Sequence, residues 1–263
     1  MATKAEINAA SLIEQYSKAI HSPHYSVACS PACPVCNMDT DLYNKARKIM
    51  ELTKEKNMEL SPEQKSDRGP FVATLSGAYF FIYECNIEDI PVEDMAHALS
   101  MNVRFNGHIK RFYSVAEHSC YISDLAGTAA ALAGMKREEV RRVALWGLLH
   151  DITEAFVPDI PRPFKPVIVG FKEYEDKLAQ KVARQYNLSW PMPDLVKYMD
   201  TNIVRLEAEV LFPNPPIWTN HYDDLTSIAT EVGIEPQKDF GQEPDMAFRM
   251  FMDRYESLTG SVA

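Results

Sequence analysis

The chain has no long uncharged apolar run among its 263 residues. The longest such runs, for example Ala144 to Leu149, are far shorter than the roughly 20 residues that a membrane-spanning helix needs. Its start, Met1-Ala-Thr-Lys-Ala-Glu-Ile, lacks the basic region and apolar stretch of a secretory signal and is typical of an amphipathic helix. We therefore expect a cytoplasmic protein with no membrane partner.

Positive charge is also scarce, since 27 Lys and Arg residues face 37 Asp and Glu residues and the formal net charge is -10. Affinity for a nucleic acid polymer depends on Lys and Arg that neutralise phosphates, so this balance argues against DNA or RNA as a partner. A small phosphate ester remains compatible with it. A bound cation and a few basic side chains can make a cleft locally positive.

Cysteines are few and odd in number, which favours reduced thiols over a disulfide framework. Three of them, together with one histidine, lie close together in a turn-rich segment and could close a tetrahedral structural zinc site. A loop of free thiols is favoured over this site, because a strong zinc signal has two paired CxxC elements. The candidate zinc ligands are His24, Cys29, Cys33 and Cys36, and the other cysteines are Cys85 and Cys120.

Hydrophobic residues make up 46% of the chain, which is enough for a sizeable core, and the sequence contains no repeats or low-complexity blocks. Apolar residues recur mainly at helical spacing, so we expect a mostly α fold, a helical bundle with a small β-hairpin at 71–84. We divide the chain into an N-terminal accessory helical region (1–70), a core (71–212) and a C-terminal helical extension packed on that core (213–263). Helices are expected near 114–134, 137–155, 170–187, 193–212, 222–232 and 243–259.

Four polar residues fall where helices should face the core. His118 shares a helical face with apolar residues, although a lone histidine there is more often a hydrogen-bonded core residue. His150 and Asp151 follow the apolar run Ala144 to Leu149, where an unpaired carboxylate would be costly to bury and a bound cation would offset that cost. Asp200 borders the apolar stripe of a later helix. Two histidines and two aspartates suit manganese, cobalt, iron, nickel or zinc better than magnesium or calcium alone.

This arrangement resembles the HD-domain phosphohydrolases, whose pattern is H…HD…D across successive helices. The likeness covers most of the chain from Arg104 to Leu211 and is strongest to bacterial 5′-deoxyribonucleotidases and to bacteriophage-encoded relatives that include deoxynucleotide triphosphohydrolases. Three blocks carry it, in the same order: Arg104-Phe105-Asn-Gly-His108, Tyr113-Ser-Val-Ala-Glu-His118-Ser and His150-Asp151-Ile-Thr-Glu154-Ala.

The resemblance implies that the fold is an HD-domain bundle and that His118, His150, Asp151 and Asp200 hold one divalent transition metal. Asp151 would thus belong to the catalytic centre, together with Glu154. Glu154 lies four residues after His150 and three after Asp151, so on a helix its carboxylate would share their face and act as general base or orient the attacking water. The resemblance also implies a homo-oligomer, a dimer or larger.

Substrate contacts follow from the same likeness. Arg104 matches the arginine that binds the substrate phosphate, and its planar guanidinium suits that role. Phe105 stands where the bacterial deoxyribonucleotidases carry a tryptophan that helps reject a ribose 2′-hydroxyl, so sugar selectivity stays open. Asp159 matches an aspartate that contacts the sugar 3′-hydroxyl, and Lys165 matches a lysine near the phosphate. Arg162 could add a second positive charge there, and supporting roles are expected for His108, Glu117 and Glu207.

The expected function is hydrolysis of a small nucleotide, first of all a 5′-nucleotidase that converts a deoxynucleoside monophosphate to deoxynucleoside and phosphate. A deoxynucleoside triphosphate triphosphohydrolase, of the dATP type for example, is the alternative, with a second metal such as magnesium for the longer phosphate chain. That reaction needs further basic groups, for which Lys110, Arg111, Arg162 and Lys165 are available. A catalytically silent nucleotide sensor is the third interpretation.

Overall fold

The computed structural model describes residues 68–260, which belong to one compact unit of the chain. The candidate zinc residues His24, Cys29, Cys33 and Cys36 lie outside the described residues, as does nearly all of the expected accessory region. No helix of the described part is both long and apolar enough to cross a membrane.

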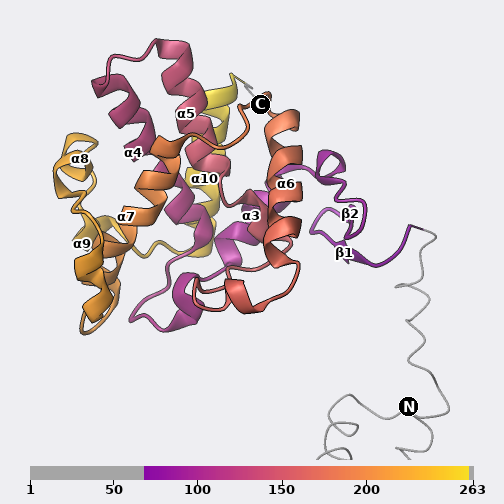
Figure 1. Cartoon of the computed structure of the whole chain (residues 1–263), viewed down its shortest axis with the longest axis horizontal. Helices are drawn as coiled ribbons and strands as arrows, with labels where there is room; N and C mark the ends of the chain where they lie inside the picture. The colour runs from indigo at the N-terminus through magenta and orange to yellow at the C-terminus, as the bar shows by residue number, and fades with distance from the viewer. Residues whose placement is uncertain (1–67, 261–263) are drawn as a thin grey trace, which may run out of the picture. The chain divides into compact units, whose positions relative to one another are not determined.

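The described residues are mostly α-helical with one small antiparallel hairpin, as the sequence predicted (Figure 1). The α-helices are α3 (Val92–Met101), α4 (Val115–Leu132), α5 (Arg137–Leu149), α6 (Phe171–Gln185), α7 (Asp194–Leu211), α8 (Thr226–Glu231), α9 (Pro236–Asp239) and α10 (Pro244–Thr259). Short 3-10 helices are η2 (Ile87–Asp89), η3 (Arg104–Gly107), η4 (Ile152–Ala155), η5 (Lys165–Val167) and η6 (Ile217–His221). The strands are β1 (Phe71–Ala73) and β2 (Tyr79–Phe81).

The hairpin pairs β1 with β2 in the register Phe71↔Phe81, and its turn includes Ser76 and Gly77. Gly77 has a φ of 89°, a left-handed conformation that glycine adopts without a Cβ penalty. The carboxylate of Asp94 on α3 accepts hydrogen bonds from the Ser76 backbone N–H and the Thr74 hydroxyl. The hairpin is therefore tied to the next helix along the chain.

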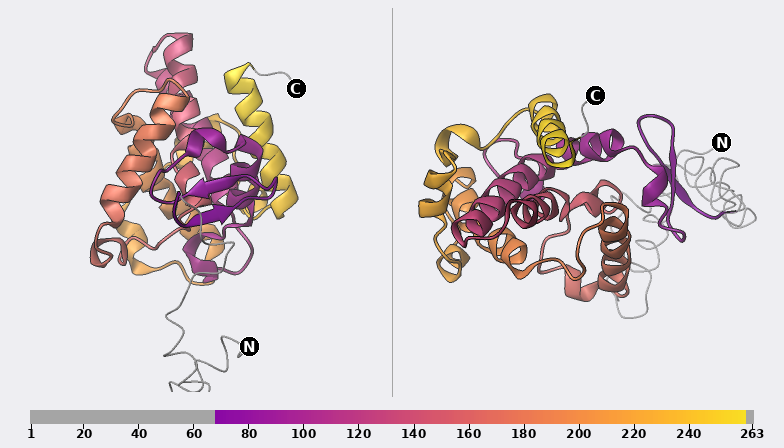
Figure 2. Two further views of the ribbon diagram at one scale, coloured as in Figure 1. Left: turned by 90° about the vertical axis from the view of Figure 1, so that its right-hand side faces the viewer. Right: turned by 90° about the horizontal axis from the view of Figure 1, so that it is seen from above.

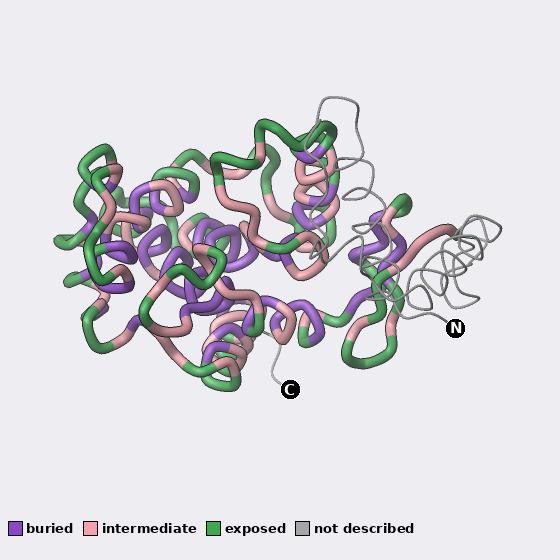
Figure 3. The backbone as a smooth tube through the Cα atoms, turned by 90° about the horizontal axis from the view of Figure 1, so that it is seen from below, coloured by how far each residue is buried: buried purple, intermediate pink, exposed green. Residues whose placement is uncertain are grey.

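Helices α4 and α5 form the centre of the bundle, with α10 packed against both and α7 packed mainly against α4 (Figure 2). Gly147 allows the two central helices to approach closely, since a Cβ there would lie 2.8 Å from the Ser123 Cα. Buried residues gather along these inner helices, whereas exposed ones follow the outer loops (Figure 3). The carboxylate of Glu117 on α4 accepts hydrogen bonds from the backbone N–H groups of Gly241 and Gln242, which anchors the C-terminal part to the core.

Two of the expected helices differ from the observed ones by more than two residues at one end, and the others agree more closely. The helix expected over 137–155 ends at Leu149, and the tighter η4 follows, because Asp151 has left the α-helical region with φ -106° and ψ 14°. Glu154 therefore does not share an α-helical face with His150. The helix expected from 222 starts at Thr226, where the Asp224 carboxylate accepts a hydrogen bond from the Thr226 backbone N–H.

Candidate metal centre

Three helices bring together the four residues that the sequence singled out. His118 comes from α4, His150 and Asp151 follow the last turn of α5, and Asp200 comes from α7. One nitrogen or oxygen of each lies within 4.8 Å of those of the other three, so the group could hold a metal ion. The His118 Nε2 atom lies 3.2 Å from His150 Nε2 and 3.3 Å from Asp200 Oδ1. The His150 Nε2 atom lies 3.1 Å from Asp151 Oδ2.

The hydrogen bond at Nδ1 of each imidazole determines whether Nε2 can act as a metal ligand. The Nδ1 of His118 lies 2.6 Å from Glu207 Oε1, and the Nδ1 of His150 lies 2.8 Å from the Gly147 carbonyl oxygen. An ionised carboxylate and a carbonyl only accept hydrogen bonds, so both Nδ1 atoms carry the hydrogen. In the neutral rings both Nε2 lone pairs then point at one spot beside two carboxylates, an arrangement that calls for a cation.

The electrostatics of the cluster agree with this demand. Burial lowers the pKa of His150, but the Asp151 and Asp200 carboxylates outweigh it and hold this pKa well above its ordinary value. Burial raises the pKa of Asp151, yet His150 brings it down to about 2. The pKa of Asp200 also lies well below its ordinary value, because the hydrogen bonds to both histidines overcome its burial. The cluster therefore stabilises positive charge at its centre, as the donor set for a divalent cation would.

Glu207 connects this cluster to Arg104. Its fully buried carboxylate accepts hydrogen bonds from His118 Nδ1, from the Tyr113 hydroxyl at 2.9 Å and from Arg104 Nη2 at 3.0 Å. Burial raises the pKa of Glu207, but Arg104 and His118 bring it down to about 2. Glu207 therefore stays ionised and fixes both a candidate metal ligand and the arginine expected to bind phosphate, in line with its predicted supporting role.

The loop that carries Arg104 has an unusual backbone. Phe105 and Asn106 have φ values of 55° and 50°, which lie in the left-handed region that residues other than glycine seldom adopt. The Arg104 side chain remains only 11% exposed and its Nη1 lies 3.9 Å from Asp151 Oδ2. Such strained residues cluster at functional sites, and here they hold Arg104 between Glu207 and Asp151.

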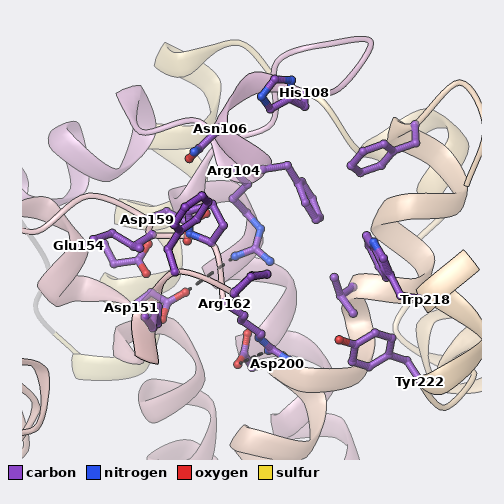
Figure 4. A pocket seen from close by; sticks show the side chains of 18 residues that line it. Arg104, Asn106, His108, Asp151, Glu154, Asp159, Arg162, Asp200, Trp218 and Tyr222 are labelled. Carbon is purple, nitrogen blue, oxygen red and sulfur yellow. Dashed lines mark hydrogen bonds and ion pairs between the residues drawn. The ribbon is translucent and has the colours of Figure 1, made fainter. Parts of the chain in front are cut away.

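A cavity of about 610 Å³ opens beside the cluster (Figure 4). It is within the size range of small-molecule sites in proteins. Asp151 and Asp200 reach its surface, while His118 and His150 are not among its lining residues. The lining also includes most of the residues that the sequence proposed for catalysis, substrate binding or support: Arg104, Phe105, His108, Glu154, Asp159, Arg162 and Lys165.

Two polar atoms at the cavity are buried without a hydrogen-bond partner among the described residues, Glu154 Oε2 and Arg104 Nε. Burial raises the pKa of Glu154 well above its ordinary value, and the charges of Asp151 and Asp159 raise it further. Unpaired buried polar atoms are rare and costly, so both atoms indicate a place for a polar ligand or water.

The remaining basic residues differ in how they face the cavity. Lys165 Nζ donates to Glu175 Oε1 at 2.9 Å, and Arg162 Nη2 lies 3.3 Å from Asp200 Oδ2. Lys110 and Arg111 are not among the lining residues, and Arg111 donates to the Gln237 carbonyl oxygen.

Sequence reasoning did not identify the apolar side of the cavity, which includes Val204, Phe212, Trp218 and Tyr222. Trp218 lies in the C-terminal extension (213–263), for which the sequence predicts only helices packed on the core. The signal was the large aromatic residues that follow the end of α7.

No protein-family model matches the chain. An Escherichia coli (strain K12) protein, Uncharacterized protein YfdR, is 31% identical over 192 residues, which cover 72% of this chain and 96% of that protein. A Rhodobacter capsulatus protein, Uncharacterized protein RCAP_rcc00048, is 34% identical over 142 residues, which cover 51% of this chain and 69% of that protein. The similarity to YfdR extends over nearly its whole length, and the chain therefore belongs to the same protein family as YfdR.

Proposed function

We propose that this protein is a metal-dependent phosphohydrolase of the HD type that removes phosphate from small nucleotides, with deoxynucleoside monophosphates as the first candidate substrates. The observation that carries the proposal is the group of two histidines and two aspartates beside a cavity that also contains Arg104 and Glu154. The reaction would consume one water and yield a deoxynucleoside and orthophosphate.

His118, His150, Asp151 and Asp200 would hold the metal. Their two imidazole nitrogens and two carboxylate oxygens suit manganese, cobalt, iron, nickel or zinc. When bound, such an ion supplies Lewis-acid polarisation of a phosphoryl oxygen and increases the acidity of water.

Arg104 would bind the phosphate from the protein side. Its guanidinium is already held by Glu207 through Nη2, and its buried Nε has no hydrogen-bond partner among the described residues. A phosphate oxygen would provide an acceptor for that N–H, so binding would satisfy a buried donor. Lys165 would add charge from the opposite loop, where it also pairs with Glu175.

Glu154 would take the proton from the attacking water. Its Oε2 atom is buried without a hydrogen-bond partner among the described residues, and Glu154 lines the cavity. Burial raises the pKa of Glu154, so its ionised form is a stronger base than an exposed carboxylate, while Arg104 and Lys165 favour ionisation. Phosphate binding beside Arg104 would bring the reacting atoms to this side of the cavity.

The number of basic residues at the cavity favours a monophosphate over a triphosphate. Of the four basic residues available for a longer phosphate chain, Arg162 and Lys165 line the cavity. Both already pair with a carboxylate, Asp200 and Glu175 respectively. Lys110 and Arg111 lie elsewhere, which leaves few groups for β- and γ-phosphates together with a second metal such as magnesium.

The test is product analysis with ribo- and deoxynucleoside mono- and triphosphates in the presence of manganese, cobalt, magnesium or zinc. Orthophosphate and nucleoside from monophosphates, absent in Asp151→Ala, is the expected result. Nucleoside and tripolyphosphate from triphosphates alone would replace the nucleotidase by the triphosphohydrolase. Nucleotide binding without any turnover would replace catalysis by a sensing role.

A further inference from the structure

Four aromatic residues, Phe105, Phe212, Trp218 and Tyr222, line one side of the cavity and are here called the aromatic wall. In Figure 4, Trp218 and Tyr222 lie on the side of the cavity away from Asp151 and Glu154. All four residues are half-buried and line the cavity. The family resemblance implies that Phe105 lies near the sugar, and the proposed hydrolysis leaves the other three without a role.

The rings support one another edge to face. The ring centroids of Phe105 and Phe212 lie 5.3 Å apart at an interplanar angle of 84°. Those of Phe212 and Trp218 lie 6.2 Å apart, and those of Trp218 and Tyr222 lie 6.0 Å apart, both at 89°. Perpendicular contacts at these separations are favourable aromatic pairs. The wall is thus a connected surface rather than four independent side chains.

Helix α7 fixes the far end of the wall. The Asn202 Oδ1 atom accepts a hydrogen bond from the Asp223 backbone N–H at 2.8 Å, and Arg205 donates to the Tyr222 carbonyl oxygen at 3.3 Å. The Tyr198 hydroxyl donates to the Asp223 carboxylate at 2.7 Å. The same helix carries Asp200, so the distance between the wall and the metal centre is set by one rigid element.

The cavity therefore has two chemically different sides. Basic side chains of Arg104, Arg162 and Lys165 accompany the metal centre, whereas the wall offers aromatic carbon. A ligand that satisfies both sides carries an anionic group at one end and a flat aromatic ring at the other.

We infer that the aromatic wall binds the nucleobase of the substrate by stacking, with Trp218 as its main contact; this rests on the proposed function. Tryptophan presents the largest ring of the four. Base stacking on an aromatic side chain tolerates every base, because each base has a π face. The base is therefore required for affinity, while its identity matters little, with purines favoured modestly over pyrimidines.

The test compares substrates with and without a base, dAMP, dCMP and 2-deoxyribose 5-phosphate, on the wild type and on Trp218→Leu. Stacking on one aromatic residue contributes on the order of 1–3 kcal/mol, so we expect KM for dAMP to rise about tenfold or more in Trp218→Leu. KM for 2-deoxyribose 5-phosphate and kcat for all three should stay unchanged. Trp190→Leu is the matched control, since Trp190 is 42% exposed and outside the cavity lining. Tyr222→Leu provides a second wall variant if Trp218→Leu does not fold.

Equal KM values for dAMP and the base-free ester in the wild type would overturn the inference while leaving the phosphohydrolase intact. An equal rise in KM for dAMP and for 2-deoxyribose 5-phosphate in the wall variants would also overturn it. Calorimetric binding of deoxyadenosine, which has no phosphate, tests base binding independently of hydrolysis. If no ester is hydrolysed but deoxyadenosine binds the wild type and Trp190→Leu and not Trp218→Leu, the wall is the base site and the proposed hydrolysis is wrong.

Discussion

The two sides of the cavity are built differently. On the metal side, His118 and Glu207 are completely buried, come from the long helices α4 and α7, and are joined by a hydrogen bond of 2.6 Å. On the aromatic side, Trp218 and Tyr222 are half-buried and lie in or just after the short η6. One side is part of the core, and the other is a surface segment fastened to it.

The difference follows from what each side has to do. A metal centre requires ligand atoms within a few tenths of an ångström of their places, which helices and buried hydrogen bonds provide. A stacking surface requires only a flat ring near the plane of the base and tolerates larger shifts in its position. We therefore expect substitutions on the metal side to remove metal binding and turnover, and substitutions on the aromatic side to change KM alone.

The largest effect is expected for Asp200→Ala, which removes one of the four candidate ligands. Loss of a group that merely supports a ligand lowers metal affinity or activity about 10- to 100-fold, so loss of a ligand itself should lower both by more than about 100-fold. Asp194→Ala on the same helix is the control, because its side chain is fully exposed. Manganese titration by calorimetry and phosphate release measure the two effects. Equal metal affinity in Asp200→Ala and the wild type would contradict the ligand assignment.

Glu207→Gln should come next. The glutamine amide keeps the shape of the Glu207 carboxylate but lacks its negative charge. That charge holds the hydrogen of His118 on Nδ1 and pairs with Arg104. We expect metal affinity and kcat/KM to fall about 10- to 100-fold, with a loss of stability because the buried Arg104 charge loses its partner. Glu209 lies two residues after Glu207 on α7 and is exposed, so Glu209→Gln is the control and should change neither metal affinity nor stability. Thermal unfolding and metal titration are the measurements, and unchanged metal affinity with lowered stability would reduce Glu207 to a structural residue.

The sequence predicted much of the metal side for a physical reason. Polar residues at or beside core-facing positions of apolar helices have few explanations, so their positions drew attention to His118, His150, Asp151 and Asp200. The resemblance to the HD-domain phosphohydrolases then implied that the four form one metal site. The geometry of Glu154 was less predictable, since the change from α5 to η4 depends on local hydrogen bonds such as that from the Glu154 N–H to the Asp151 carbonyl.

Pairing between distant segments could not be predicted from periodicity. Arg104 and Glu207 are 103 residues apart, and only the packing of α7 beside the loop before α4 brings them together. The aromatic wall has the same origin, because Phe105 meets Phe212 across the fold. Periodicity finds which residues face a core, but it does not tell which of them meet.

Lys165→Ala tests whether the cationic side binds phosphate. Lys165 lines the cavity, its side chain is 33% exposed, and its Nζ pairs with the Glu175 carboxylate. We expect KM to rise about tenfold for dAMP and for 2-deoxyribose 5-phosphate alike, since one charge-assisted hydrogen bond of about 1.5 kcal/mol is lost. Lys172→Ala, whose side chain is 76% exposed and pairs with Asp176, is the control. A rise for dAMP alone would place Lys165 at the base instead of the phosphate.

The smallest effect is expected for Asn202→Ala, which separates the two sides most sharply. Asn202 is buried and its side chain accepts the Asp223 N–H, so its loss leaves that donor unpaired and loosens the segment that carries Tyr222. One such hydrogen bond contributes about 1 kcal/mol, so we expect a rise in KM of about fivefold for dAMP and none for 2-deoxyribose 5-phosphate. Asn220→Ala, exposed in η6, is the control. Because Asn202 lies only two residues from Asp200, a fall in metal affinity in this variant would show that the two sides are not independent, and an unchanged one would confirm that α7 holds the wall and the metal centre by separate contacts.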